Sequence, residues 1–145
     1  MKGLSFLAGG EFFAADVTRV QKVARKMMIT PVPTAQSAIV GITNLKGRVI
    51  TIFSLDELLG RNRKEISDIA TAVIFKSRDG YDQMGLLIDK TGSLVDIDDT
   101  KIRPPKLASG TEESFCISGI AESGDKLYRI IDIDSIINKF RREQK

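Results

Sequence analysis

The sequence predicts a mainly β protein with mostly antiparallel strands. Seven short apolar runs, bounded by glycine and polar clusters, have the composition of strands: LSFLA, EFFAAD, RVITIFSL, TAVIFKS, QMGLLID, FCISGIA and KLYRIIDI. Tight turns join several of these runs, because short hairpin loops suit Gly9-Gly10, Asp79-Gly80 and Ser123-Gly124-Asp125. The strand number fits two small barrels that share strands, although no sequence repeat is evident.

Helices are expected to be few and short. Ser54 and Glu57 have the S-x-x-E spacing of a capping box, and Gly60 can end the turn or two that follows. Asp134 is expected to cap a C-terminal helix with one apolar face, formed by Ile136, Ile137 and Phe140.

A further helical turn is predicted after Asp16. Val17, Val20 and Ala24 follow it at helical spacing, although valine and threonine also suit a strand. The segments 61–68 and 98–114 contain the polar, proline and glycine clusters of loops.

The composition argues against an enzyme. The chain has no histidine, which removes the commonest general base, the commonest metal ligand and every Ser-His or Cys-His pair. Its single cysteine, Cys116, lies in an alternating apolar run and is expected to be a buried, inert thiol. Serine, threonine and lysine are frequent, but none accompanies a visible base or nucleophile motif. We therefore expect no catalytic residue.

Charge and hydropathy predict a soluble, cytoplasmic protein. No apolar run approaches the ~20 residues of a membrane span, and the N-terminus does not read as a signal peptide. The net charge is only +3, from 22 basic and 19 acidic residues, and the chain has no tryptophan. The basic residues are best explained as solvated ends and loops, so we expect no nucleic-acid partner.

The segment from Gly41 approximates a phosphate-binding loop. Such a loop needs Gly-Lys followed by Ser or Thr, and then a helix N-terminus. Here Lys46 precedes Gly47 and Arg48, and the β-branched run at 49–52 favours a strand. Nucleotide binding is therefore disfavoured.

Two groups of acidic residues are better explained as turns and caps than as chemistry. Asp96, Asp98 and Asp99 resemble the start of a calcium loop, but the glycine and glutamate that such a loop needs are missing. Asp132 and Asp134 fit a half-exposed strand that leads into a helix cap. We expect neither a metal nor a cofactor.

The chain resembles the CheW family of bacterial chemotaxis coupling proteins. Six blocks follow the family's order and spacing: FFAADVTRVQKV, ITPVP, IVGITNLKGRVITIFSLDELLG, QMGLLIDKTG, IRPP and ISGIAESGDKLYRIIDIDSII. The most specific of them is GITNLKGRVITIFSL, and the resemblance runs from about Ser5 to Phe140. It implies a single CheW-like domain over 1–145, built of two packed SH3-like five-stranded β-barrels whose strands can be intertwined.

The resemblance also implies partners. Members of the family are non-enzymatic adaptors that couple the cytoplasmic tips of methyl-accepting chemoreceptors to the histidine kinase CheA, whose regulatory domain is itself CheW-like. The expected location is therefore in receptor arrays at the inner face of the membrane. The receptor's helical tip is expected between the barrels, near Val17, Val20, Gly41, Asn44 and Lys46. No residue is assigned to the kinase, and the two valines also suit core packing.

Two positions depart from the family's usual pattern. Lys46 replaces an arginine, which keeps the charge but loses the planar fork that binds a carboxylate at two points. Thr51 and Ser54 stand where the family usually has Pro-x-x-Asp, and serine caps a helix about as well as aspartate. Two alternatives stay open: a coupling protein of a non-flagellar chemosensory system, and a small basic barrel that binds nucleic acid.

Overall fold

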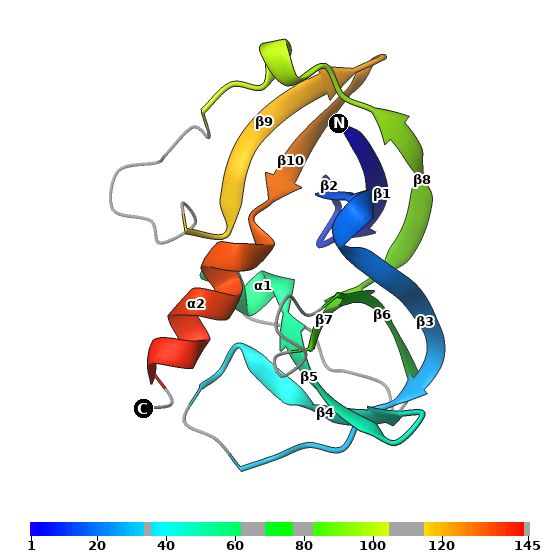
Figure 1. The fold of residues 1–145 in the computed structure, drawn as a ribbon, viewed down its shortest axis with the longest axis vertical. Coiled ribbons are helices and arrows are strands. Elements are labelled where there is room, and N and C mark those ends of the chain that lie inside the picture. The colour runs from blue at the N-terminus through cyan, green and yellow to red at the C-terminus, as the bar shows by residue number, and fades with distance from the viewer. Residues whose placement is uncertain (34–35, 62–68, 77–82, 105–114, 144–145) are drawn as a thin grey trace.

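The computed structural model describes residues 1–33, 36–61, 69–76, 83–104 and 115–143. Within them the strands form two five-stranded sheets (Figure 1). The first sheet has, in spatial order, β8 (Lys90–Asp96), β1 (Lys2–Ala8), β2 (Glu11–Asp16), β10 (Lys126–Ile131) and β9 (Ile117–Ser123). The second sheet has β3 (Val20–Met28), β6 (Ile69–Phe75), β7 (Met84–Ile88), β5 (Arg48–Ser54) and β4 (Ile39–Leu45).

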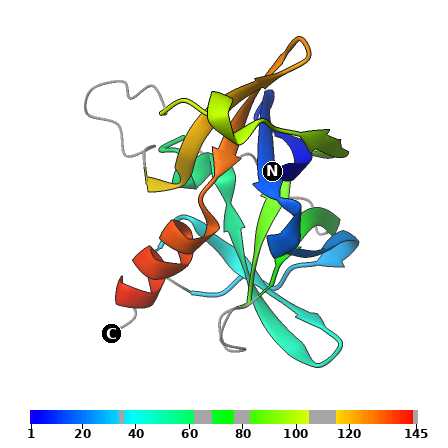
Figure 2. The same ribbon diagram turned by 45° about the horizontal axis from the view of Figure 1, so that its top comes forward.

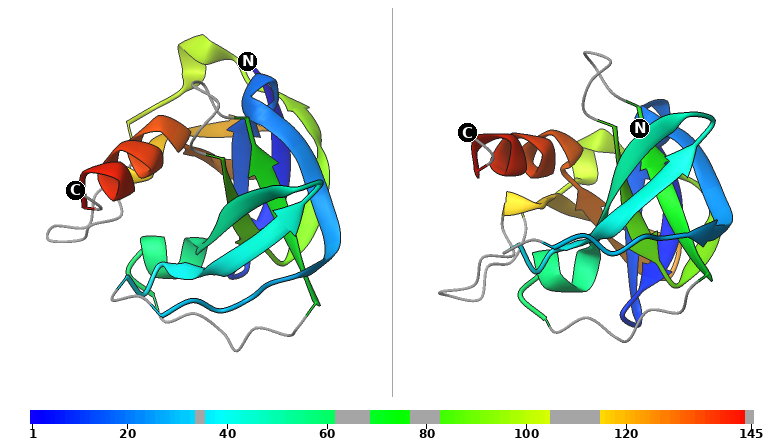
Figure 3. Two further views of the ribbon diagram at one scale, coloured as in Figure 1. Left: turned by 60° about the horizontal axis from the view of Figure 1, so that its bottom comes forward. Right: turned by 90° about the horizontal axis from the view of Figure 1, so that it is seen from below.

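Both sheets have the same pairing pattern. Neighbouring strands are antiparallel except at one junction in each sheet, where β10 runs parallel to β2 and β5 runs parallel to β7. The sheets curl, as Figure 3 shows from two sides. The mainly β prediction is therefore confirmed, and the curled sheets are consistent with SH3-like barrels.

The chain crosses between the sheets twice. It leaves β2 through a 3-10 turn, η1 (Val17–Arg19), to enter β3, and it leaves β7 to enter β8 (Figure 2). The halves 2–58 and 69–143 therefore have the same order of five strands and a helix, and each half gives two strands to one sheet and three to the other. This structural repeat was not evident in the sequence.

The hydrophobic core has three parts. One smaller cluster belongs to the first sheet, around Ala14 and Tyr128, and another to the second sheet, around Ile52 and Ile74. The largest cluster joins both sheets to both helices and includes Phe6, Phe13, Phe53, Phe75, Leu58, Ile136 and Phe140. The rings of Phe53 and Phe140 lie 4.7 Å apart between centroids, so the C-terminal helix is anchored directly on the second sheet.

The helix cap at Ser54 is confirmed, although the backbone N–H of Ser54 donates to the carbonyl of Ala38 at 2.8 Å, where a capping box would bring the Glu57 side chain. Helix α1 (Leu55–Leu58) begins after Ser54, whose hydroxyl oxygen accepts the backbone N–H of Glu57 at 3.3 Å. Gly60 follows with φ 79°, the left-handed conformation that commonly ends a helix.

Asp134 is not the cap of the C-terminal helix, so that prediction was wrong. Helix α2 (Ile133–Glu143) starts one residue earlier, and the carboxylate of Asp132 accepts the N–H of Ser135 at 3.1 Å. Asp134 lies in the first turn, where one carboxylate oxygen accepts a 3.0 Å hydrogen bond from Nη1 of Arg19 and the other lies 3.0 Å from Nη2 of the same guanidinium. A charged pair therefore ties η1 to α2.

The helix expected after Asp16 is only one turn long. Asp16 caps η1 by accepting the N–H of Thr18, and the chain then extends into β3. Strands β4 and β8 were not among the predicted runs either. Of the expected loops, residues 62–68 and 105–114 lie outside the described residues, as does the turn at Asp79-Gly80.

Candidate partner-binding surface

The segment that approximates a phosphate loop is a β-hairpin. Leu45 pairs with Arg48, and the two residues between them both have positive φ, 52° for Lys46 and 82° for Gly47. This is the conformation of a type I′ turn, whose twist matches that of the strands it joins. The side-chain oxygen of Asn44 accepts the N–H of Gly47 at 3.0 Å and holds the turn closed. Lys46 is exposed at the tip.

Gly41 has a packing role. It is buried in β4, and the carbonyl oxygen of Thr30 lies where a β-carbon of residue 41 would be. Thr30 and Ile42 exchange two backbone hydrogen bonds of 2.8 and 2.9 Å across this point. The second half of the chain repeats the arrangement, because Arg103 forms the same bridge with Ile120 beside Gly119.

The two valines lie at the opposite end of β3 from the hairpin contact. Val17 opens η1 and is half-buried. Val20 begins β3, pairs with Phe75, and packs against the largest core cluster. The last residue of β3, Met28, receives a 2.7 Å hydrogen bond from the hydroxyl of Thr43 in β4. The predicted contact residues therefore lie in two places. Val17 and Val20 are at the start of β3, whereas Gly41, Asn44 and Lys46 are in or beside β4, which contacts the end of β3.

A groove separates the outer strands of the second sheet. We call it the β3–β4 groove. It is lined by residues 22–28 of β3, by Thr30 and by residues 43–45 of β4, and its volume is about 500 Å³. Among the predicted residues it includes Asn44 and neither valine. Figure 3 shows the β4–β5 hairpin reaching toward β3. Sequence reasoning missed the groove because both bordering strands were missed.

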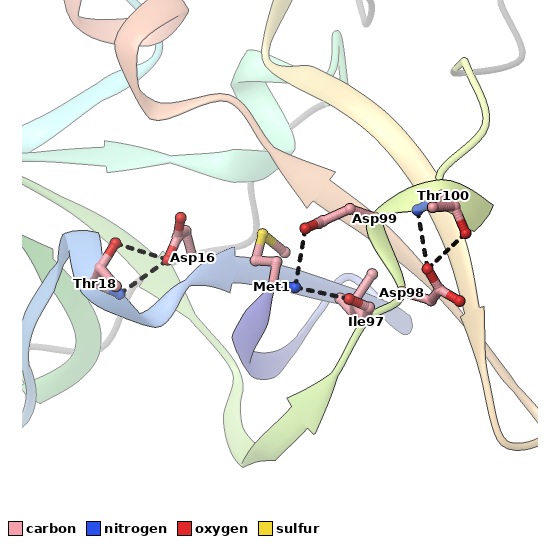
Figure 4. A network of polar contacts seen from close by, with 7 residues as sticks. All are labelled: Met1, Asp16, Thr18, Ile97, Asp98, Asp99 and Thr100. Carbon is pink, nitrogen blue, oxygen red and sulfur yellow. Dashed lines mark hydrogen bonds and ion pairs between the residues drawn. The ribbon is translucent and has the colours of Figure 1, made fainter.

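The acidic residues after β8 form a turn. Asp98 accepts the backbone N–H and the hydroxyl of Thr100, at 3.0 and 2.7 Å, and so caps the 3-10 turn η2 (Asp99–Lys101) (Figure 4). The hydroxyl bond, followed by the backbone bond, lowers the pKa of the Asp98 carboxyl below its ordinary value of 3.8. Asp99 contacts the amino group of Met1 at 3.3 Å, and the same amino group donates to the carbonyl of Ile97 (Figure 4).

The described residues contain neither a cluster of metal-ligating side chains nor a membrane-spanning helix. In that part of the chain, no three histidine, cysteine, aspartate or glutamate side chains gather closely enough to hold a metal ion. None of its helices has the length and apolar character needed to cross a membrane. Cys116 is fully buried beside α1, as expected, and its thiol lies 3.9 Å from the carbonyl of Leu58.

Comparison with known proteins identifies the fold and the family together. The family model described as CheW-like domain matches residues 2–141. The chain belongs to the CheW-like family. Its structure is similar to the crystal structure of the scaffolding protein TtCheW from Thermoanaerobacter tengcongensis, with a TM-score of 0.78 and 26% identity over 91% of this chain and 88% of that one.

Curated relatives agree with this assignment. The chain is 27% identical to the chemotaxis protein CheW of Rhizobium meliloti, over 97% of this chain and 89% of that protein. It is 25% identical to the chemotaxis protein CheW of Bacillus subtilis, over 95% and 87% of the two chains. It is also 26% identical to the protein PilI of Pseudomonas aeruginosa, over 61% of this chain and 48% of PilI. The members of the CheW-like family that it resembles are thus named as chemotaxis and scaffolding proteins.

Proposed function

We propose that this protein is a non-enzymatic adaptor that couples the cytoplasmic tips of chemoreceptors to the histidine kinase CheA. The observation that carries the proposal is the CheW-like match over residues 2–141, almost the whole chain. The absence of histidine from the sequence supports a role in binding rather than in catalysis. Control of the kinase would then arise because receptor conformations differ in how they bias the assembled complex.

For the receptor contact we propose the hairpin tip and the start of β3. Lys46 and Asn44 are exposed, so a helical receptor tip can reach both without rearranging the fold. Val17 and Val20 are half-buried and offer apolar surface near the junction of the two sheets. Gly41 contributes by allowing Thr30 to lie against β4 and hold the hairpin in place.

Co-sedimentation tests the proposal. The purified protein is mixed with the regulatory domain of CheA, with a receptor tip fragment in membranes or nanodiscs, and with both together. We expect binding to each partner alone and a larger complex when all three are present. A correctly folded protein that binds neither partner would refute the adaptor function.

The match to PilI supports a second candidate within the same class. On this reading the protein couples receptors to the kinase of a chemosensory system other than flagellar chemotaxis. Deleting the gene separates the two, because loss of swimming chemotaxis favours the first and loss of surface motility with normal swimming favours the second.

A further inference from the structure

The β3–β4 groove lies between two strand edges that lack a strand partner. β3 and β4 are the outermost strands of the second sheet. The hydrogen bonds of Thr30 to Ile42 and of Thr43 to Met28 close one end of the groove. Beyond these contacts the described chain has no pairing between the two strands. Since alternate residues of an antiparallel ladder direct their backbone groups away from the partner strand, the groove is bordered by amides and carbonyls that pair with no strand among the described residues.

The β3 side of the groove is positively charged. Lys22, Arg25 and Lys26 line it, and the lining contains no acidic residue. Lys22 and Lys26 are exposed and form no ion pair with any residue that the structure describes. Arg25 donates to the hydroxyl of Thr91 at 3.4 Å and, within the described residues, to no other side chain. No acidic residue in this part of the chain therefore pairs with these three cations.

A bulge places two of these cations. The pairing of β3 with β6 shifts between Ala24 and Met27, so Arg25 and Lys26 together oppose a single residue of β6 and the edge strand has one extra residue there. Lys26 has φ 54°, a left-handed conformation that is unfavourable for a lysine. Apolar side chains of Val23, Met27 and Leu45 line the same groove. The surface thus combines charge, apolar contact and unpaired backbone.

Lysines and bulges on an edge strand also prevent unwanted sheet growth. This protection depends on the charge of the approaching strand. A basic strand is repelled by Lys22 and Lys26, and a neutral strand forms no ion pair with them. An acidic strand can place carboxylates beside both lysines. The same features that prevent pairing between two copies of β3 therefore favour an acidic partner.

We infer that the β3–β4 groove binds an extended acidic peptide segment of a partner protein, which adds a strand along one of its edges. Strand addition uses the unpaired backbone for affinity and the groove's side chains for specificity. A nucleic acid would satisfy the cations but not the backbone amides and carbonyls, so a peptide fits better. The groove shares Asn44 with the proposed receptor contact but includes neither Lys46 nor the two valines, so peptide binding at Lys22 and Lys26 can be tested apart from receptor binding.

Fluorescence anisotropy with short labelled peptides tests the inference. The first peptide alternates valine with glutamate, the second replaces every glutamate with lysine, and the third keeps glutamate but is N-methylated at alternate amides. We expect the acidic peptide to bind at least about tenfold more tightly than either of the others. Amide chemical shifts should change along 22–28 and 43–45. Equal binding of all three peptides, or shifts elsewhere, would overturn the proposal.

Protein variants localise the effect. Lys22→Glu and Lys26→Asn should each weaken the acidic peptide several-fold, and asparagine tolerates the positive φ at position 26. Lys101→Glu, in η2 outside the groove, is the matched control and should bind as the wild type does. Equal losses in all three variants would show only nonspecific attraction. Displacement of the acidic peptide by a single-stranded oligonucleotide of the same charge, at the same affinity, would assign the groove to polyanions instead.

Discussion

The carbonyl oxygen of Thr30 occupies the space that a β-carbon on Gly41 would need. The chain after β3 can therefore lie directly on β4, where Thr30 and Ile42 form two backbone hydrogen bonds. The same contact forms one end of the β3–β4 groove and holds the base of the β4–β5 hairpin. A glycine in the most family-specific segment of the sequence thus has a packing role within the fold itself.

Gly41→Ala should destabilise the fold. The new methyl group would meet a backbone carbonyl and the Cγ2 of Ile29, the latter at 2.9 Å, and a backbone cannot move aside as a side chain can. We expect a loss of about 1–3 kcal/mol in the free energy of unfolding, measured by chemical denaturation. Gly3→Ala is the control, because its nearest neighbours would be at 3.4 Å and its effect should stay within about 0.5 kcal/mol. Equal effects in the two variants would contradict the close approach.

Lys46→Glu should weaken binding to the receptor tip without loss of stability. The side chain is exposed and the substitution reverses its charge, while glutamate tolerates the positive φ no worse than lysine does. Lys46→Asn removes the charge and suits the type I′ turn, so it should weaken binding but raise stability by about 1 kcal/mol. Lys46→Arg should bind at least as well as the wild type. Co-sedimentation measures receptor binding, and thermal unfolding measures stability. Unchanged binding in both the Glu and the Asn variants would show that Lys46 does not take part in the receptor contact.

Asp132 should be replaceable by serine. It directly follows β10, and Ser54 is the last residue of β5, and each side chain caps the helix that comes next. We expect Asp132→Ala to cost about 1 kcal/mol of stability and Asp132→Ser to cost only a few tenths. Chemical denaturation of both variants checks this. A loss as large in the serine variant as in the alanine variant would show that Asp132 acts through its charge rather than as a cap.

The pKa of the Asp98 carboxyl should rise in Thr100→Val. The variant removes the hydroxyl bond that contributes most to the lowered pKa of this group. Because the pKa is lowered in the folded state, the carboxylate stabilises the fold above its unfolded pKa, and this contribution is lost as the pH falls through the folded value. An NMR titration of the side-chain carboxyl carbon measures the shift. Lys101→Gln, which removes a weaker cause, should raise the pKa less; the reverse order would contradict the assignment.

Strands with a continuous or alternating apolar pattern could be predicted from the sequence, including the edge strand β9, whereas the edge strands β3, β4 and β8 were missed. β3 has Lys22, Arg25 and Lys26 on an edge with a bulge, so its apolar residues lose the alternation of a strand and imitate helical spacing. β8 is polar and largely exposed for the same reason, since it borders the first sheet. Whether a strand lies at an edge depends on how all the strands of the sheet pair, so the local sequence cannot predict it.

The candidate site shows the same limit. The Lys46-Gly47 turn and the Ser54 cap depend on residues close in sequence, and the local pattern indicated a glycine turn, a strand and a helix cap in the right order. Asp134, the predicted cap of α2, instead forms an ion pair with Arg19, which lies 115 positions earlier in the chain. The groove likewise requires knowing which strands are outermost. The Arg19–Asp134 ion pair and the β3–β4 groove are formed by segments distant in sequence, so the local pattern could not predict them.

Because each half of the chain gives strands to both sheets, the two sheets can form at different stages of synthesis. The second sheet comes from one continuous stretch, residues 20–88, so its strands can pair while the rest of the chain is still being synthesised. The β1–β2 hairpin is synthesised before the second sheet, yet its partners β8 and β10 are synthesised after it. We therefore expect this hairpin to wait for its partners and to complete the first sheet only after the second sheet has formed.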